Sequence, residues 1–385
     1  MSSTPPPPYG QSQLSAVQVL GGGSAGSSAH VRSLTAGLVA RGVRVTVCAP
    51  AELESAYGFA DVGAEVVTVP RRGDPVAVAA LRSACGGADV VHAHGLHAAV
   101  RTAFALSGRA ARRDGAPGPR TGHGGRVPLV VTWHTRAHAE GPRGHVVRLM
   151  ERSAARAAAV VLGTSSDLVD RARSRGARDA RLAPVTVPAP RPPEEFRESK
   201  ARAELGAVER PLLMAVGSLV PHRGYDVLLD ASRAWRDLDP APLVTIAGEG
   251  RERAALQRRI EAEDLPVRLL GRRDDIAELL AAADVAVLPS RWEARSVLAQ
   301  EALRAGVPLV ATRVGGIPEL VGRAAEFVPY GDPRALASTV LALLADPDRR
   351  AALAEEGLRQ AATWPTEDET VAQVLSVYDE LTGQS

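Results

Sequence analysis

Residues 17–50 carry the first structural signal of the chain, VQVLGGGSAGSSAHVRSLTAGLVARGVRVTVCAP. An apolar strand ends at Leu20, a Gly-rich loop follows, and a helical stretch runs to about Arg41, where Gly42 is suited to end it. Pro50 closes a second apolar strand. This order of strand, loop, helix and strand predicts a right-handed βαβ unit with two parallel strands.

Outward from this unit, the alternation of strands and helices continues and then starts again. Further strands are expected at 65–69, 90–93, 129–133 and 159–163. After a Pro-rich stretch, strands are expected at 211–218, 243–250, 267–271, 285–290 and 308–312. Two such runs predict an α/β protein with two doubly wound, Rossmann-like domains. Ligands of such domains bind beyond the carboxyl ends of the strands.

The segments between these runs set the expected domain boundaries. Residues 1–13 are polar and Pro-rich, and we expect them to form a disordered tail. The N-terminal domain is expected at 14–187, with a mobile loop at 107–127 that is rich in Gly, Pro and Arg. A linker at 188–210 leads to the C-terminal domain at 211–363. Two domains are also what a chain of 385 residues favours.

The bulk properties of the chain exclude several classes of protein. A formal net charge of +2 gives no reason to expect a nucleic-acid partner. Cys48 and Cys85 lie apart, without the spacing of a metal or redox site. Apolar runs stay well short of the ~20 residues of a membrane span. The N-terminus lacks the basic start and apolar stretch of a secretion signal, so we expect a cytoplasmic protein.

The Gly-rich loop of the first domain leaves two interpretations open. Gly21, Gly23 and Gly26 fit G-x-G-x-x-G between a strand and a helix, which alone would indicate a dinucleotide. Such a site also needs an acidic residue near the end of the second strand, and that strand ends Cys-Ala-Pro, with Glu52 too late. NAD is therefore a minor alternative. The loop otherwise suits close approach of an anionic ligand, or is a tight turn without one.

The C-terminal half contains PSRWEARSVLAQEALRAGVPLVATRVGGIPELV at 289–321. This stretch closely resembles the signature of glycosyltransferase family 4, whose mark is two glutamates separated by seven residues, here Glu293 and Glu301. The resemblance extends to the first Gly loop, to VVTWHT, and to AVGSLVPHRGYDVLLDA. It implies the GT-B fold, in which two Rossmann-like domains face each other across a cleft. It also implies a final helix, within 364–385, that crosses back to the first domain.

The resemblance implies a site with contributions from both domains. The implied catalytic residues are His134 and Glu293. The implied donor-binding residues are Gly22, Gly23, Ser218, Arg223, Gly271, Arg272, Arg295, Ser296, Val297, Leu298 and Glu301. No cofactor and no metal are expected.

The roles follow from the resemblance together with the chemistry of a nucleotide-sugar. Its diphosphate gains negative charge as the glycosidic bond breaks, and helix-start amides and an arginine suit that charge. Glu301 would hold the ribose hydroxyls, and Glu293 would contact the sugar or face the reaction centre. His134 would touch the donor sugar, and residues 271–273 lie where the family often holds the base.

Three positions depart from the family pattern. Ser218 stands where an arginine is common, and Arg223 replaces a lysine and keeps its charge. The Gly-rich stretch after the first glutamate becomes Ala-Arg-Ser at 294–296. Arg295 is therefore a candidate for the missing phosphate cation.

Other polar motifs receive weaker interpretations. Of His92 and His94, one is expected to line the cleft and the other to pack; with no third ligand nearby, they do not indicate a metal site. The sequence Asp-Leu-Asp at 237–239 is interpreted as a helix end rather than a metal motif. Arg148, Arg152 and Arg156 share one helix face. We favour a solvated face for them, with at most peripheral membrane contact.

The predicted function is retaining transfer of a hexose-type sugar from a nucleotide-diphosphate sugar to an acceptor hydroxyl. The acceptor is a small molecule, a glycan or a lipid-linked compound. The departing phosphate oxygen would take the acceptor proton, so no protein nucleophile is needed. The alternatives are a catalytically silent nucleotide-sugar-binding protein of the same fold, and a sugar-phosphate phosphorylase or epimerase.

Overall fold

A computed structural model describes residues 14–22, 25–71, 75–107, 127–136, 141–185 and 196–383. The chain divides into two compact units. Unit 1 comprises residues 1–163, 169–183 and 367–385, and unit 2 comprises residues 164–168 and 184–366. The expected tail at 1–13 and most of the expected loop at 107–127 lie outside the described residues.

Unit 1 is built on a parallel sheet, which has seven strands in the described residues. The strands are β1 Ser15–Leu20, β2 Arg44–Ala49, β3 Glu65–Thr68, β4 Val90–His94, β5 Leu129–Trp133, β6 Val160–Gly163 and β7 Ala180–Leu182. Their order is β3-β2-β1-β4-β5-β6-β7. The helices are α1 Ala25–Ala40, α2 Ala51–Tyr57, α3 Pro75–Cys85, α4 Leu96–Leu106, α5 Gly141–Ala157, α6 Ser166–Ser174, α15 Glu367–Thr382 and the short 3-10 helix η1 Ala60–Val62. The first three residues of α6 are assigned to unit 2.

Unit 2 repeats this architecture with a parallel sheet of six described strands. They are β8 Leu212–Val216, β9 Leu243–Ala247, β10 Val267–Gly271, β11 Val285–Leu288, β12 Leu309–Thr312 and β13 Ala325–Val328, in the order β10-β9-β8-β11-β12-β13. The helices are α7 Phe196–Leu205, α8 Tyr225–Ser232, α9 Arg253–Ala262, α10 Ile276–Ala281, α11 Val297–Arg304, α12 Ile317–Val321, α13 Pro333–Ala345, α14 Pro347–Ala362 and the 3-10 helices η3 Pro221–Arg223 and η4 Arg233–Trp235.

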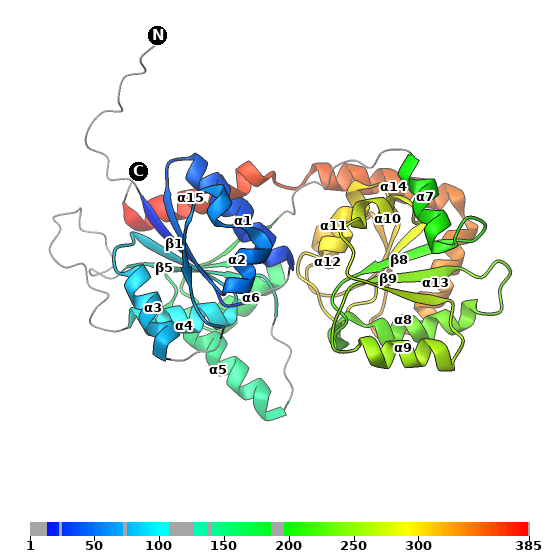
Figure 1. Cartoon of the computed structure of the whole chain (residues 1–385), viewed down its shortest axis with the longest axis horizontal. Helices are drawn as coiled ribbons and strands as arrows, with labels where there is room; N and C mark the ends of the chain where they lie inside the picture. The colour runs from blue at the N-terminus through cyan, green and yellow to red at the C-terminus, as the bar shows by residue number, and fades with distance from the viewer. Residues whose placement is uncertain are drawn as a thin grey trace, which may run out of the picture. The chain divides into compact units, whose positions relative to one another are not determined.

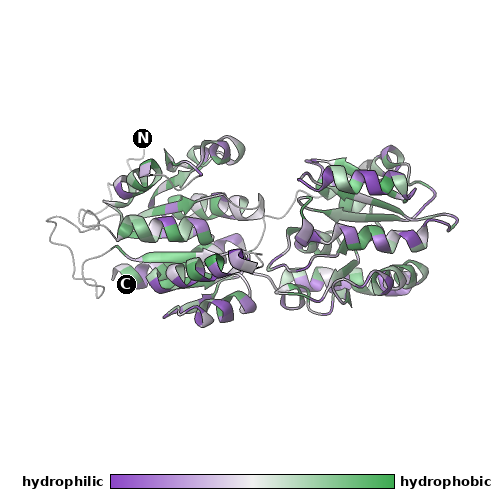
Figure 2. Ribbon diagram, turned by 90° about the horizontal axis from the view of Figure 1, so that it is seen from below, coloured by the Kyte–Doolittle hydropathy of each residue, from purple (hydrophilic) through white to green (hydrophobic). Residues whose placement is uncertain are grey.

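Both sheets are Rossmann-like, which confirms the fold class predicted from the sequence. In each, the strand order reverses between the first strand and the fourth, at β1 and β4 in unit 1 and at β8 and β11 in unit 2. The strands are apolar along most of their length, as Figure 2 shows, because helices cover both faces of each sheet. Ligands of such sheets bind at the reversal point, beyond the carboxyl ends of the strands.

The last helix of the chain belongs to unit 1 and packs beside α1 (Figure 1). Its apolar face is buried in the core of that unit through Val371, Val374, Val377 and Leu381. Full burial of such side chains contributes about 1.5–3 kcal/mol each. Gly37 permits the close approach, since a Cβ there would lie 2.5 Å from a methyl group of Val371.

Two segments differ from the expected boundaries. The range expected as a linker, 188–210, contains the helix α7, whose Ala201 and Leu205 are buried in the core of unit 2. Trp364, expected to begin the returning segment, is also buried in unit 2, where its indole donates to the carbonyl of Leu320 at 3.0 Å. The chain changes unit at Glu367.

Candidate functional site

The two loops at the reversal point of unit 2 carry several of the predicted site residues. One loop follows β8 and reaches Gly224, and the other follows β11 and spans 289–296. Gly224 has φ +70° and lies so close to the second loop that a Cβ would stand 2.0 Å from the carbonyl oxygen of Pro289. The amide of Arg291 also donates to the carbonyl of His222 at 2.8 Å. The loops therefore pack backbone against backbone.

Arg223 and Glu293 form an ion pair between these loops. Their side chains are only 20% and 12% exposed. Ser290 donates its hydroxyl to the same carboxylate oxygen at 3.0 Å. Burial raises the pKa of Glu293, and the guanidinium of Arg223 opposes that rise. Among the described residues, the buried Nε of Arg223 has no hydrogen-bond partner. The sequence did not reveal that these two residues contact each other.

The helix α11 begins directly after the second loop. Its N-cap is Ser296, whose hydroxyl accepts from the amide of Ala299 at 3.3 Å. The amides of Val297 and Leu298 lie in the first turn, where helix geometry provides no internal acceptor. Glu301 lies four residues after Val297, on the same helix face. It is half-buried, and burial raises the pKa of its carboxyl.

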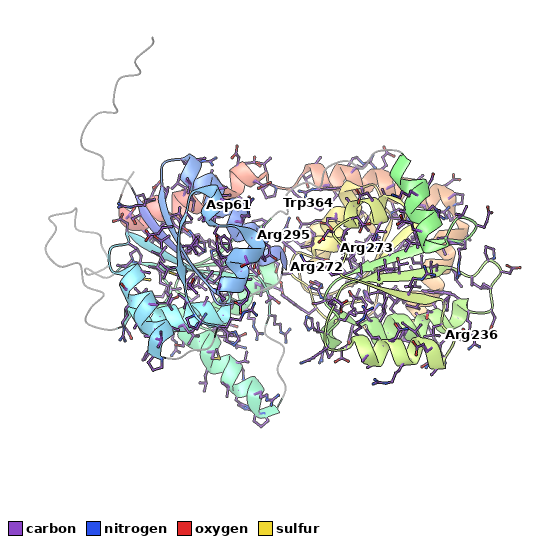
Figure 3. The ribbon with its side chains drawn as sticks, in the orientation of Figure 1. Asp61, Arg236, Arg272, Arg273, Arg295 and Trp364 are labelled. Atoms are coloured by element: carbon purple, nitrogen blue, oxygen red, sulfur yellow. The ribbon has the colours of Figure 1, made fainter. Side chains whose placement is uncertain are left out.

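Arg295 has a different environment from the one predicted. Its Nε donates to the main-chain carbonyl of Val185 at 2.8 Å, and its guanidinium lies 6.0 Å from the ring centroid of Trp364 (both labelled in Figure 3). Burial lowers the pKa of Arg295 to about 10. The side chain thus binds the segment that enters unit 2. The predicted role as a replacement phosphate cation finds no support in these contacts.

The remaining predicted donor-binding positions of unit 2 differ in exposure, and Gly271 is buried. Ser218 is exposed after β8. Gly271, with φ +74°, accepts from the amide of Gly248 at 2.8 Å and so ties the ends of β9 and β10 together. The side chain of Arg272 is 83% exposed. Arg273, which is labelled beside Arg272 in Figure 3, donates to Asp275 at 2.7 Å.

In unit 1, the Gly-rich loop follows β1. Gly23 lies outside the described residues, and Gly22 has φ +114°. A Cβ on Gly21 would stand 2.6 Å from Nη2 of Arg101, a residue that the sequence did not single out. Glu52 lies in the first turn of α2, past the end of β2, and its carboxylate is 3.9 Å from Arg71. This position does not provide the strand-end acid of a dinucleotide site.

Histidines cluster at the carboxyl ends of β1, β4 and β5. His134 directly follows β5, and its Nε2 lies 3.2 Å from Nδ1 of His94. The ring centroid of His30 is 5.5 Å from that of His134, and His92 stacks on His94 at 4.2 Å. Burial lowers the pKa of His30 to about 4 and that of His92 to about 3. These rings are therefore neutral at physiological pH.

Two residues that the sequence did not indicate complete this cluster. Gln18 on β1 donates to the hydroxyl of Tyr378 on α15 at 2.8 Å and contacts Nε2 of His94 at 2.8 Å. The expectation that one of His92 and His94 packs while the other lines a cleft is too simple. Both are buried, with exposures of 0% and 3%, and both take part in hydrogen bonds.

The comparisons with known proteins now decide the family. Residues 25–188 match the glycosyl transferase 4-like domain, and residues 210–346 match the glycosyl transferases group 1 domain. The D-inositol 3-phosphate glycosyltransferase of Corynebacterium glutamicum is 30% identical over 283 residues, which cover 66% of this chain and 67% of that protein. The chain belongs to glycosyltransferase family 4. The resemblance seen in the sequence is thus confirmed.

Other relatives of this family 4 glycosyltransferase agree. The D-inositol 3-phosphate glycosyltransferase of Xylanimonas cellulosilytica is 29% identical over 399 residues, covering 94% of this chain and 93% of that protein. The solved structure of Anabaena HepE in complex with UDP-glucose has a TM-score of 0.77 and 20% identity. That match covers 95% of this chain and 100% of HepE. It supports the GT-B fold.

The surface of this family 4 glycosyltransferase has one feature that bears on its partners. On α5, the apolar side chains of Val146 and Leu149 are 56% and 63% exposed, close to the exposed Arg148. Peripheral membrane contact stays a prediction. Within the described segments, no helix has the length and hydropathy needed to cross a membrane. Over the same segments, no cluster of His, Cys, Asp and Glu is arranged to hold a metal ion.

Proposed function

We propose that this glycosyltransferase transfers a hexose-type sugar from a nucleoside-diphosphate sugar to an acceptor hydroxyl, with retention of the anomeric configuration. The observation that carries the proposal is the Arg223–Glu293 ion pair beside the start of α11, at the reversal point of the unit 2 sheet. A cation, helix-start amides and carboxylates are the groups that a diphosphate, a ribose and a sugar require.

In this proposal the diphosphate binds at Arg223 and the amides of Val297 and Leu298. Glu301 accepts hydrogen bonds from the ribose hydroxyls. The bond between the anomeric carbon and the phosphate oxygen breaks while the acceptor oxygen bonds to the same face of that carbon. The departing phosphate oxygen takes the acceptor proton. His134 and Glu293 contact the sugar, so catalysis consists of positioning and charge stabilisation.

The names of related proteins suggest which donors and acceptors to test first. HepE structures contain UDP and UDP-glucose. A relative from Mycolicibacterium smegmatis is named for its dependence on GDP-mannose. It is 32% identical over 200 residues, which cover 48% of this chain and 52% of that protein. Several relatives are named D-inositol 3-phosphate glycosyltransferases. We therefore propose UDP- or GDP-hexoses as donors and D-inositol 3-phosphate as the first acceptor to try.

The test is nucleotide release from UDP- and GDP-hexoses with and without the acceptor, followed by NMR of the product. The proposal expects acceptor-dependent release and a product with the anomeric configuration of the donor. An inverted product would disprove retention. Binding without release for every donor and acceptor tried would favour a silent binding protein, and release that requires inorganic phosphate would favour a phosphorylase.

A further inference from the structure

A continuous network of side-chain hydrogen bonds inside unit 1 ends at His134. It links side chains from β1, β4, β5 and α15, and its members are Gln18, His92, His94, Thr132, His134 and Tyr378. The strands place these groups on one sheet face. Gln18 pairs with His92 in the β1–β4 register, and His94 pairs with Thr132 in the β4–β5 register. The same face is apolar toward the amino ends of the strands.

The hydrogen bonds on one side of this network determine which nitrogen of His92 is protonated. The amide nitrogen of Gln18 donates to the hydroxyl oxygen of Tyr378 at 2.8 Å. The single hydroxyl hydrogen of Tyr378 is therefore available for Nδ1 of His92, 2.7 Å away. Because a neutral imidazole carries one hydrogen, His92 is protonated on Nε2, from which it donates to Thr132 at 2.6 Å.

The hydrogen bonds on the other side of the network determine which nitrogens of His94 and His134 are protonated. With its amide nitrogen directed at Tyr378, Gln18 presents its oxygen to Nε2 of His94, which donates at 2.8 Å. Nδ1 of His94 is then an acceptor and receives the Nε2 hydrogen of His134, 3.2 Å away. His134 therefore keeps a lone pair on Nδ1. Burial lowers the pKa of His94 and of His134, so neither ring acquires a second hydrogen near neutral pH.

The reverse arrangement of protons is less favourable. It would direct the oxygen of Gln18 at Tyr378, make the hydroxyl of Thr132 the donor to His92, and place the hydrogen of His134 on Nδ1. A phenol is a stronger donor than an aliphatic alcohol, and an imidazole nitrogen is a stronger acceptor than an amide oxygen. The contact from Tyr378 to His92 therefore favours the first arrangement.

We propose that Gln18 and Tyr378 are positioning residues that hold His134 in the Nε2–H tautomer, with Nδ1 as a hydrogen-bond acceptor for a sugar hydroxyl. The contact with the sugar rests on the proposed function, whereas the tautomer does not. Tyr378 comes from the last helix of the chain, so α15 completes the histidine cluster of unit 1 as well as its core. His30, which packs edge-on against His134, lies beside this chain of bonds.

The test is long-range ¹H–¹⁵N correlation NMR of ¹⁵N-histidine-labelled full-length protein near neutral pH. His134→Asn assigns the signal of interest. The proposal expects the wild-type ring of His134 to carry its hydrogen on Nε2 alone. In Tyr378→Phe, Gln18 loses its acceptor, and the signal should become an average of both tautomers. Tyr330→Phe, at a 40% exposed position in unit 2, is the matched control and should change nothing.

Gln18→Met provides a second variant if Tyr378→Phe does not fold, and it should average the tautomers in the same way. A wild-type His134 protonated on Nδ1 overturns the proposal, as does an unchanged tautomer in both variants. If only one tautomer is productive, an equal mixture lowers kcat/KM about twofold. A correct tautomer in a protein that releases no nucleotide would refute the proposed function and leave this inference standing.

Discussion

The Arg223 guanidinium and the Glu293 carboxylate form an ion pair between the loops that follow β8 and β11. The pair needs the close loop approach that Gly224 permits. It holds the guanidinium in a defined position before any ligand binds, which reduces the ordering that binding requires. It also places a carboxylate beside the cation that we assign to the diphosphate, so the two residues should respond differently to mutation.

Arg223→Ala should weaken donor binding much more than Ser218→Ala. Hydrogen bonds to charged groups contribute about 1.5–3 kcal/mol, so a loss of about tenfold or more in donor affinity is expected. Ser218 is exposed and carries no charge. Arg223→Lys keeps the charge and should retain more affinity than Arg223→Ala. Calorimetric titration of folded variants measures this, and equal effects at positions 218 and 223 would mean that the diphosphate binds elsewhere.

Mutation of the two glutamates should change different kinetic constants. Glu301 contacts the ribose equally before and during reaction in our proposal, so Glu301→Ala should raise the donor KM more than it lowers kcat. Glu293 acts near the sugar, where charge develops, so Glu293→Gln should mainly lower kcat. Steady-state kinetics at matched folded fractions decides between these patterns. Near-wild-type constants for both variants would refute the assigned site.

Donor turnover should not require a divalent metal ion. In the proposal, Arg223 and the amides of Val297 and Leu298 supply the positive charge that a divalent ion supplies elsewhere. Nucleotide release should therefore be unchanged in EDTA, with protein passed through chelating resin as the control. Complete loss of release that added Mn²⁺ or Mg²⁺ restores would contradict this prediction.

The stability of unit 1 should fall as the pH is lowered through the weakly acidic range. Burial lowers the pKa of His30 to about 4 and that of His92 to about 3 in the folded protein, from an ordinary value of 6.5 for histidine. Between these values the unfolded state binds more protons, so the free energy of unfolding decreases with decreasing pH. The loss is about 2 kcal/mol per histidine at pH 5.

Urea unfolding at several pH values measures this dependence. His30→Asn should make the free energy of unfolding depend less steeply on pH, whereas His145→Asn, at an exposed position, should leave this dependence unchanged. The slope of this dependence, rather than the absolute stability, is the relevant quantity, because His30→Asn also alters packing. Stability that stays constant between pH 6.5 and pH 5 would mean that the cluster is hydrated or already charged.

The regular alternation of strands and helices was sufficient to predict both sheets, except for one edge strand of each, β7 and β13. They were missed because their apolar runs are short: Arg181 lies in the middle of the three-residue β7, and Glu326 interrupts the four-residue β13. The helix α7 was assigned to the linker because the Pro-rich stretch before it dominated the local pattern. The apolar residues Ala201 and Leu205, four positions apart, were the available signal in the sequence, and both are buried in the structure.

The site was predictable only where a family motif marked it. Glu293, Glu301 and His134 have local signatures, whereas Gln18 and Tyr378 are 360 residues apart and meet only in the folded chain. A polar Gln18 inside an apolar strand was a usable sign of a buried hydrogen bond. The side-chain direction of Arg295 could not be inferred, since it depends on where Val185 enters unit 2.

Equilibrium titration of the wild-type protein with UDP, GDP and NAD in parallel tests directly whether unit 2 holds a nucleotide-sugar site. We expect saturable binding of at least one nucleoside diphosphate, which weakens in Arg223→Ala, and no saturable binding of NAD. Saturable binding of NAD with no binding of either nucleoside diphosphate would refute the assigned donor site. The Gly-rich loop after β1 would then have to be assigned to a dinucleotide.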